Sequence, residues 1–302
     1  MSDPTVTVPA ATMPPHRSAT SPESSVDLDA YFARIDYTGP RTPTLETLAG
    51  IVAAHIRHIP FEGIDPLLGI AVAALDAETL QDKLVRRRRG GYCFEQNGLL
   101  GYVLRELGFS VDALAGRVVW MKDTDTLPAE THQLLRIMSP QFDGPRLVDV
   151  GFGGQTPTTP LRHVLDEPQE TDHEPFRITR DDSEWRSSSP LTMETLIDGT
   201  WRPVYLFADT ARPRIDLEVA SWYVSTQPSS HFVTGLNAAI VADDARWNLR
   251  GRHLSIHRRG GGTEKKSLAD AGEVLDLLEH RFGIDVATID ALPDAVAKVL
   301  DN

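Results

Sequence analysis

The spacing of the apolar residues changes at Gly108, and this change limits the folds that the chain can adopt. Before Gly108 the apolar residues recur at helical spacing, most regularly in residues 93–107. After Gly108 short β-prone runs are separated by polar or Pro/Gly segments. Gly108 itself stands where the C-terminus of a helix favours glycine. The sequence therefore predicts an α+β protein with a mainly helical first unit and a second unit built from strands.

The expected elements follow this division. The first unit is predicted to contain a loop over residues 59–69 and helices over 26–35, 42–59, 76–89 and 93–107. The second is predicted to contain strands over 110–120, 132–138 and 146–152, and a hairpin over 191–208 with its turn at Asp198–Gly199. A helix over 214–227 should lead to strands over 231–243 and 246–259. A last helix follows, with Ser267 as its N-cap and Gly283 as its end.

The charge and cysteine content exclude several classes of function. The 302 residues include 30 basic and 43 acidic side chains, and the net charge of −13 disfavours general binding to nucleic acids or anionic membranes. The one cysteine cannot form an internal disulfide, and no apolar run approaches the ~20 residues that span a bilayer. A reducing, cytoplasmic setting fits best. Residues 1–26, rich in Pro, Ser and Thr, do not resemble a signal peptide, so we expect a disordered tail.

The only cysteine stands in RRGGYCFEQN, residues 88–97, between two glycines and the start of a predicted helix. A lone cysteine is more often a small buried apolar residue than a nucleophile. At a helix N-terminus, however, free backbone N–H groups and the helix dipole stabilise a thiolate. Gly90 and Gly91 leave room for a substrate carbonyl, and the same N–H groups can hold an oxyanion. The position favours a nucleophile that attacks an acyl group.

A thiol nucleophile normally needs a histidine, and the chain contains ten. His132 opens a predicted strand in the unit that follows the Cys93 helix, and Asp149 lies among apolar residues in RLVDVGFGG, residues 146–154. A carboxylate in an apolar strand is costly unless it is paired, and a histidine on the neighbouring strand is a natural partner. Two plainer interpretations stay open: Asp149 as a strand-end residue bonded to a loop, and His132 as a solvated strand terminus.

From about Asp27 onward the chain resembles the bacterial arylamine N-acetyltransferases. The resemblance is carried, in order, by IPFEGIDPLLG, RRGGYCFEQN, RLVDVGFGG, WRPVYLF, SWYVSTQPSSHF and the FGID near the C-terminus. The block around Cys93 is long and specific. The chain departs from the family at Gly63, where asparagine is usual, in the extra N-terminal tail, and in a polar stretch over residues 181–190.

The resemblance implies a fold of three domains with a Cys-His-Asp core like that of papain and the transglutaminases. After a tail over 1–26, a helical bundle with the nucleophile would occupy residues 27–108. A β-barrel-like domain with the histidine and aspartate would occupy 109–214. A linker helix and an α/β lid would occupy 215–302.

The resemblance also implies a ping-pong acetyl transfer. The Cys93 thiolate would take the acetyl group from acetyl-CoA, and an arylamine, arylhydroxylamine or hydrazine would then accept it. His132 would move the protons and Asp149 would fix its tautomer. Acetyl-CoA would be a co-substrate, with no metal and no tightly bound cofactor. Xenobiotic metabolism is the implied setting, with no nucleic-acid or membrane partner; the oligomeric state stays open.

The remaining site residues are assigned on the same resemblance. The predicted acceptor pocket consists of Phe61, Tyr92, Phe152 and Phe232. The predicted CoA contacts are Thr131, Gly151, Gly153 and Gly154, since glycine N–H groups can cradle a phosphate. Arg89 is predicted to support the site through an ion pair with Glu95, whereas Arg86, Arg87 and Arg88 form a solvated helix end.

Three other functions remain open. An amide synthase that closes a macrolactam on an aryl-amine polyketide thioester would use the same three residues in a larger cleft. A cysteine hydrolase or transglutaminase-like enzyme would lose the acyl group to water without any amine. A scaffold or ligand-binding protein would keep the fold without catalysis.

Overall fold

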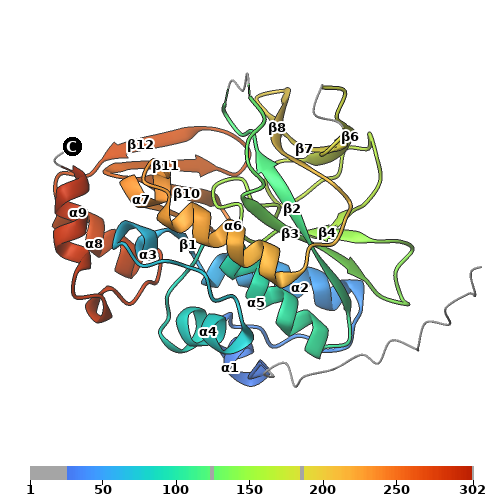
Figure 1. Cartoon of the computed structure of the whole chain (residues 1–302), viewed down its shortest axis with the longest axis horizontal. Helices are drawn as coiled ribbons and strands as arrows, with labels where there is room; N and C mark the ends of the chain where they lie inside the picture. Colours follow the sequence, from blue (N-terminus) through green and yellow to red (C-terminus); the bar gives the residue numbers. More distant parts are fainter. Residues whose placement is uncertain (1–25, 123–125, 184–186, 301–302) are drawn as a thin grey trace, which may run out of the picture.

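Helices form the first part of the chain, as the apolar spacing predicts. The structure, a computed structural model, describes residues 26–122, 126–183 and 187–300 (Figure 1). The elements are α1 (Leu28–Arg34), α2 (Leu45–His58), α3 (Ile64–Leu67), α4 (Ala77–Gln81), the π-helix η1 (Asp82–Arg86) and α5 (Cys93–Glu106). Side-chain oxygens of Asp27, Thr44 and Asp76 cap α1, α2 and α4. The expected tail lies outside the described residues except for Val26, which is buried in the helical core.

A seven-stranded antiparallel sheet follows, with strand order β5-β4-β3-β2-β8-β7-β6. Its strands are β2 (Ser110–Val118), β3 (His132–Met138), β4 (Arg146–Val148), β5 (Leu161–Arg162), β6 (Phe176–Arg180), β7 (Leu191–Ile197) and β8 (Thr200–Phe207). The predicted hairpin turn is present, with positive φ at both Asp198 and Gly199. After β5 the chain bridges to β6 at the opposite edge, through Leu165 and Gln169. These bridges bring the sheet close to a barrel.

The last part of the chain combines a smaller sheet with helices. Helix α6 (Arg214–Thr226) crosses in front of α5 in Figure 1, and the short α7 (His231–Thr234) follows it. The sheet contains β9 (Asn237–Val241), β10 (Ala245–Arg250), β11 (His253–Arg258) and β12 (Thr263–Ser267), and β1 (Phe61–Glu62) from the helical part pairs with β9 at its edge. The chain ends with three helical elements: α8 (Ala271–His280), the 3-10 helix η2 (Val286–Thr288) and α9 (Leu292–Leu300).

Five local predictions were wrong. The predicted strand over 246–259 is two strands, β10 and β11, joined by a turn at residues 251–252. Strand β4 ends at Val148, so Asp149 follows the strand and does not lie within it. The N-cap of α8 is Asp270 and not Ser267, because the Asp270 carboxylate accepts from Glu273 N while Ser267 ends β12. Residues 231–234 are helical because Ser230 caps them, so the strand starts only at Asn237. The stretch 59–69 is not a plain loop, because it contains β1 and α3.

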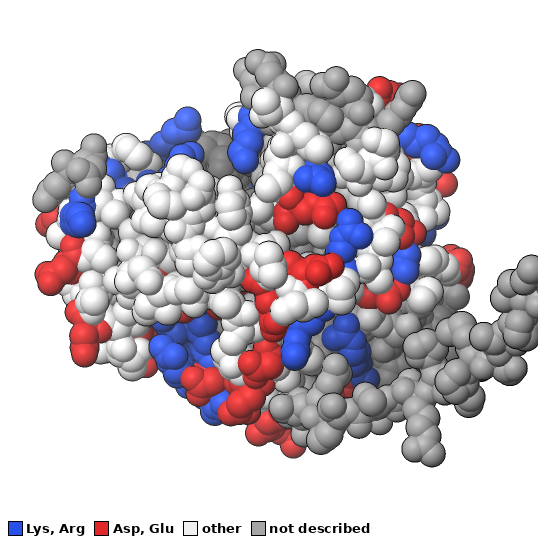
Figure 2. All heavy atoms as spheres, in the orientation of Figure 1, with Lys and Arg blue, Asp and Glu red and all other residues white. Residues whose placement is uncertain are grey.

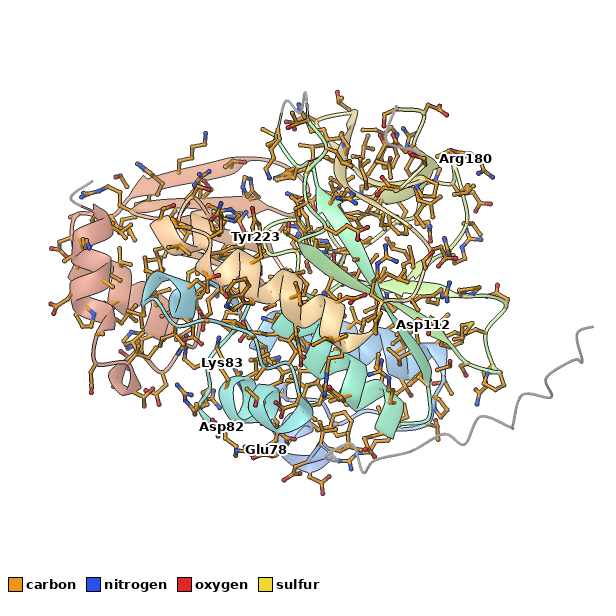
Figure 3. All side chains as sticks on the ribbon, in the orientation of Figure 1. Glu78, Asp82, Lys83, Asp112, Arg180 and Tyr223 are labelled. Carbon is orange, nitrogen blue, oxygen red and sulfur yellow. The ribbon has the colours of Figure 1, made fainter. Side chains whose placement is uncertain are left out.

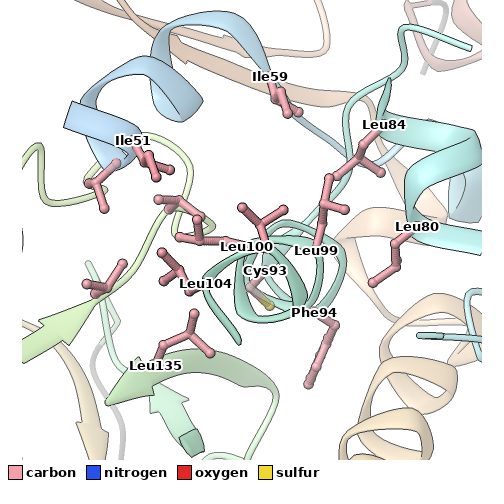
Figure 4. Close-up of a cluster of buried hydrophobic side chains, with 14 of the residues drawn as sticks. Ile51, Ile59, Leu80, Leu84, Cys93, Phe94, Leu99, Leu100, Leu104 and Leu135 are labelled. Atoms are coloured by element: carbon pink, nitrogen blue, oxygen red, sulfur yellow. The ribbon is translucent and has the colours of Figure 1, made fainter. Parts of the chain in front are cut away.

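The buried residues form three hydrophobic clusters, and α5 lies in the first of them. Leu99, Leu100 and Leu104 of α5 are buried there together with Leu135 of β3, and Cys93 belongs to the same cluster (Figure 4). The second cluster lies between the C-terminal sheet and α8 and α9, and the third within the seven-stranded sheet. Because α5 packs against β2 and β3, the N-terminus of the helix is held beside the start of β3.

Candidate active site

Cys93 is the first residue of α5, and close backbone packing fixes its position. A Cβ atom at Gly90 would lie 2.1 Å from the Pro60 carbonyl oxygen, so this position accepts only glycine. The N–H of Tyr92, the N-cap, donates to Glu95 Oε2 at 3.1 Å. The cysteine is 5% exposed. The predicted arrangement of a glycine turn, a cysteine and a helix N-terminus is therefore present, and the close approach of Gly90 explains the first glycine.

The structure brings Cys93, His132 and Asp149 together. His132 Nε2 lies 2.7 Å from Asp149 Oδ2, and both side chains are buried. Cys93 Sγ lies 3.6 Å from the backbone oxygen of Thr131, the residue before His132. Burial lowers the pKa of His132, but the charge and hydrogen bond of Asp149 outweigh it, with a further contribution from the Cys93 thiol, and the pKa rises to about 10. The imidazole therefore holds its proton at neutral pH.

Asn97 holds the other side of Asp149, and sequence reasoning missed it. Its Nδ2 donates to Asp149 Oδ1 at 3.0 Å and to Gln133 O at 2.6 Å, while its Oδ1 accepts from Val150 N at 3.0 Å. Asn97 is four residues after Cys93, so the two share one face of α5. That spacing could have identified it, because a buried amide on the nucleophile's helix face needs partners.

Two aromatic side chains enclose the imidazole. The Tyr205 ring centroid lies 4.8 Å from that of His132, and the Phe152 centroid lies 5.3 Å away. The Tyr205 hydroxyl is buried beside the Asp149 carboxylate. Burial and the nearby Asp149 charge raise the pKa of Tyr205 well above its usual 10. The phenol therefore stays neutral and lowers water access to His132. Tyr205 lies in the WRPVYLF motif, but the sequence did not identify it as a site residue.

The other predicted aromatic residues gather on the α3 and α7 side of Cys93. Phe232 lies 5.9 Å from Phe61 and 5.3 Å from Tyr92, measured between ring centroids. A Cβ atom at Gly63 would lie 2.6 Å from the Phe232 ring. Glycine at position 63 therefore makes room for Phe232.

The predicted CoA glycines lie on the segment that follows Asp149. A Cβ atom at Gly151 would lie 2.6 Å from Cys93 Cα, so glycine is needed for the segment to pass the nucleophile. A Cβ at Gly153 would lie 3.2 Å from the Phe61 ring, and a Cβ at Gly154 would lie 2.9 Å from the Asn248 amide of β10. The segment thus runs from the cysteine toward the C-terminal sheet.

The predicted ion pair between Arg89 and Glu95 is wrong. Arg89 instead binds Glu62, at 2.7 Å, and Asp65, at 2.8 Å. Glu95 binds Lys83 Nζ at 2.6 Å, and the same Nζ lies 2.7 Å from Asp65 Oδ2. The reason is the π-helix η1, which turns Lys83 inward to Glu95 and leaves Arg89 facing Glu62 of β1 and Asp65 of α3.

The pKa values of the two acids that share Lys83 shift in opposite directions. Burial raises the pKa of Asp65, but Lys83 and Arg89 outweigh it and bring the value to about 2. Burial raises the pKa of Glu95 to about 7, because Lys83 only partly opposes it and the neighbouring acids add to the rise. Both acids keep an ion-pair partner under the helix that carries Cys93.

Within the described residues, no group of three or more His, Cys, Asp or Glu side chains is arranged to hold a metal ion. None of the described helices combines the length and apolar character that crossing a membrane requires.

Comparisons with known proteins point to one family. A family model described as N-acetyltransferase matches residues 44–291. The arylamine N-acetyltransferase of Mycolicibacterium smegmatis is 55% identical over 281 residues, which cover 92% of this chain and 100% of the relative. The arylamine N-acetyltransferase of Escherichia coli is 34% identical over 260 residues, 86% of this chain and 89% of the relative.

Solved structures extend the similarity to the fold. The Mycobacterium tuberculosis arylamine N-acetyltransferase has a TM-score of 0.85 at 53% identity and covers 90% of this chain and 100% of its own. The Mycobacterium marinum enzyme, solved in complex with CoA, has a TM-score of 0.86 at 53% identity, over 90% of this chain and 99% of its own. With the family model, the relatives and the fold in agreement, the chain belongs to the arylamine N-acetyltransferase family.

Proposed function

We propose that this protein transfers the acetyl group of acetyl-CoA to the nitrogen of an aromatic amine through a thioester on Cys93. The observation that carries the proposal is the position of His132, bonded to Asp149 on one side and next to the Cys93 thiol on the other. An imidazole so placed can exchange protons with the sulfur and with any group that replaces it. Family membership supplies the substrate class.

In the first half-reaction the Cys93 thiolate attacks the thioester carbonyl of acetyl-CoA. The carbonyl carbon forms a C–S bond to Cys93 and then loses its C–S bond to CoA. The protonated His132 supplies a proton to the departing CoA sulfur. Backbone N–H groups at the start of α5 are available for the transient oxyanion. One thioester replaces another, so the acetyl group stays activated.

In the second half-reaction the amine nitrogen attacks the acetyl carbonyl on Cys93. Neutral His132 takes the proton that the nitrogen loses, and the Cys93 thiolate leaves, so the amide is released and the starting ion pair returns. Asp149 keeps His132 in the orientation that both steps need. Its bond to Nε2 leaves Nδ1 for the sulfur and the substrate.

The substrate contacts are proposed from the same geometry. Phe61, Tyr92 and Phe232 would form one wall of the acceptor pocket and Phe152 the other, since Phe232 contacts both Phe61 and Tyr92 while Phe152 contacts His132. Arylhydroxylamines and hydrazines would share this pocket with arylamines. Thr131, Gly151, Gly153 and Gly154 would lie along the CoA path, and the CoA complex of the M. marinum relative supports a CoA site in this family.

Three broader features belong to the same proposal. The chain would divide into a helical domain over 27–108, a β-barrel domain over 109–214 and a lid over 215–302. The separate clusters of the seven-stranded sheet and of the C-terminal sheet support the last two, while the cluster around α5 joins all three. A catalytic thiolate supports a reducing, cytoplasmic location. Acetylation of aromatic amines supports a place in xenobiotic metabolism.

The test is the intact mass of the purified protein after brief exposure to acetyl-CoA without amine. We expect one acetyl group on Cys93, its transfer to an anisidine added afterwards, and no acetyl gain in Cys93→Ser. Loss of the acetyl group to water at the same rate with and without amine would indicate a hydrolase. Absence of any acetyl gain would overturn the proposal in favour of an amide synthase or a protein without catalysis.

A further inference from the structure

A cavity of about 300 Å³ lies behind the catalytic helix, between α5, strands β2 and β3, and the start of α6. None of Cys93, His132 and Asp149 is among the described residues that line it. Its volume is within the range of small-molecule sites, and a cavity half this size can hold a benzene ring. The cavity is therefore separate from the proposed acetyl-transfer site and large enough for a ligand of its own.

The inner end of the cavity is polar and connected to the catalytic residues. Asn97 and Gln133 line it, and both side chains are buried. Asn97 is the residue that donates to Asp149 Oδ1. Gln133 Oε1 has no hydrogen-bond partner among the described residues. A buried acceptor without a partner costs about 1–3 kcal/mol, so a ligand that donates a hydrogen bond would gain from it.

The mouth of the cavity carries arginines, and one of them is available to bind an anion. Arg212 pairs with Glu130 at 3.2 Å and Arg214 pairs with Glu218 at 3.3 Å. Arg105 donates to the Val111 carbonyl at 3.1 Å and forms no salt bridge with any described residue. Asp112, labelled in Figure 3, also lines the mouth, but Arg136 binds it at 2.6 Å. Arg105 is thus an exposed guanidinium with room for a carboxylate.

The helix itself leaves the cavity open. Gly101 lines it from the middle of α5, where glycine costs about 1 kcal/mol relative to alanine. A Cβ atom there would lie 3.5 Å from Arg105 Nη1 and 3.7 Å from Leu135, which are ordinary contacts. Packing therefore does not require a glycine at this position, and a larger side chain would occupy the cavity.

We propose that this cavity binds a small aromatic carboxylate that carries a hydrogen-bond donor opposite its carboxylate. The carboxylate would bind Arg105 at the mouth, and the donor would reach Gln133 Oε1 at the inner end. The ring would lie among Tyr102, Leu135 and Leu217, which also line the cavity. Because the inner end includes Asn97, the ligand would contact the residue that holds Asp149.

The test is a calorimetric titration of the full chain with 4-hydroxybenzoate, which has no amine to accept an acetyl group. Acetyl-CoA and amine are left out, so the result does not depend on the acetyl-transfer proposal. We expect one molecule bound per chain, a Kd at least tenfold higher in Arg105→Gln, and no binding in Gly101→Leu. Arg87→Gln, a matched loss of an exposed arginine outside the cavity, should bind as the wild type does.

Two further comparisons fix the location of the probe. The uncharged 4-hydroxybenzamide should bind at least tenfold more weakly than 4-hydroxybenzoate to the wild type, and equally weakly to Arg105→Gln. Failure of the wild type to bind, or an unchanged Kd in both cavity variants, would overturn the proposal. A Kd raised as much by Phe232→Ala as by Arg105→Gln would also overturn it, because the probe would then occupy the predicted acceptor pocket.

Discussion

At the scale of single residues, the two oxygens of Asp149 have different partners. Oδ2 binds His132 at 2.7 Å, whereas Oδ1 accepts from Asn97 at 3.0 Å and from Gly151 N at 2.9 Å. The carboxylate is therefore held in place by the α5 helix and by its own loop before it orients the imidazole. An asparagine at this position would replace one carboxylate oxygen, which accepts hydrogen bonds, with an NH₂ group that donates them. One of the partners of Asp149 would then lose its acceptor.

Asp149→Asn should lower the rate of Cys93 acetylation by about 10⁴-fold, because an amide favours the wrong tautomer of the histidine. The rate is measured by rapid quenching after mixing with acetyl-CoA. Circular dichroism should show an unchanged fold, since Asn is the same size as Asp. A rate near that of the wild type would mean that another group orients His132.

The stability of the pair should depend on pH in a defined direction. His132 has a pKa raised from 6.5 to about 10 in the folded state, since the Asp149 charge and hydrogen bond outweigh burial. The folded protein therefore holds this proton more tightly than the unfolded chain does. Its contribution to stability is complete below about pH 6.5 and is lost as pH rises toward 10.

The check is the free energy of unfolding of the wild type minus that of His132→Gln, measured across this range. The difference should fall as pH rises, because only the wild type contains His132 and loses its proton over this range. Groups such as Glu95 titrate in both proteins, so their contributions cancel. The same comparison made in an Asp149→Asn background should lose most of its pH dependence. A difference that is constant between pH 6.5 and 10 would contradict the assigned shift.

At the scale of elements, the π-helix η1 decides which charges lie under the catalytic helix. Figure 3 shows Lys83 on the inner side of this turn, while Glu78 and Asp82 lie toward the outside. The Lys83 ammonium lies between Glu95, which accepts from the N-cap of α5, and Asp65. The buried Lys83 ammonium thus links Glu95, at the start of the helix that carries Cys93, to Asp65 of α3.

Lys83→Met should destabilise the protein by about 3–5 kcal/mol, the usual cost of removing one partner of a buried ion pair. Denaturant unfolding followed by tryptophan fluorescence measures this loss. Arg86→Met in the same π-helix is the matched control, and it should change stability little because its pairs with Glu78 and Asp82 are exposed. Equal effects of the two substitutions would show that the buried cluster has no special weight.

Some of these elements could be predicted from the sequence, and others could not. Helix α5 and the β7–β8 hairpin follow from apolar spacing and from Asp198–Gly199, which are local signals. The π-helix and the partners of Arg89 depend on contacts between distant segments, such as that of Arg89 with Glu62. The short α7 was missed because its apolar residues fit a strand equally well.

At the scale of the whole molecule, the site depends on segments that are far apart in the sequence. Phe61 pairs with Ala239 across the β1–β9 ladder, so the helical part and the C-terminal sheet share a strand pair. The sequence predicted Cys93, His132 and Asp149 as site residues. It did not predict the contacts that hold them, because side chains from distant parts of the chain form those contacts.

Acidic and basic side chains are interspersed over much of the face in Figure 2, while the area over α6 and α7 is largely uncharged.

Arg246 of β10 makes the most direct of the contacts between distant parts of the chain. Its side chain is fully buried, with Nε 2.8 Å from Glu174 Oε2 and Nη1 donating to Thr156 O at 2.8 Å. The Thr156 hydroxyl in turn accepts from Phe152 N at 2.9 Å and donates to Asp149 O at 3.3 Å. The C-terminal sheet therefore holds the loop that carries Asp149.

Arg246→Met should cost about 1–3 kcal/mol, because the buried Thr156 carbonyl loses its charged donor. It should also slow the acetylation of Cys93, since the loop from Asp149 to Thr156 loses its support. Arg177→Met is the matched control: it also removes an arginine–glutamate pair, with Glu194 at 2.6 Å, but within the β6–β7 ladder. If both variants lost stability and only Arg246→Met lost acetylation rate, the C-terminal sheet would be part of the catalytic support. Equal acetylation rates in the two would limit its role to folding.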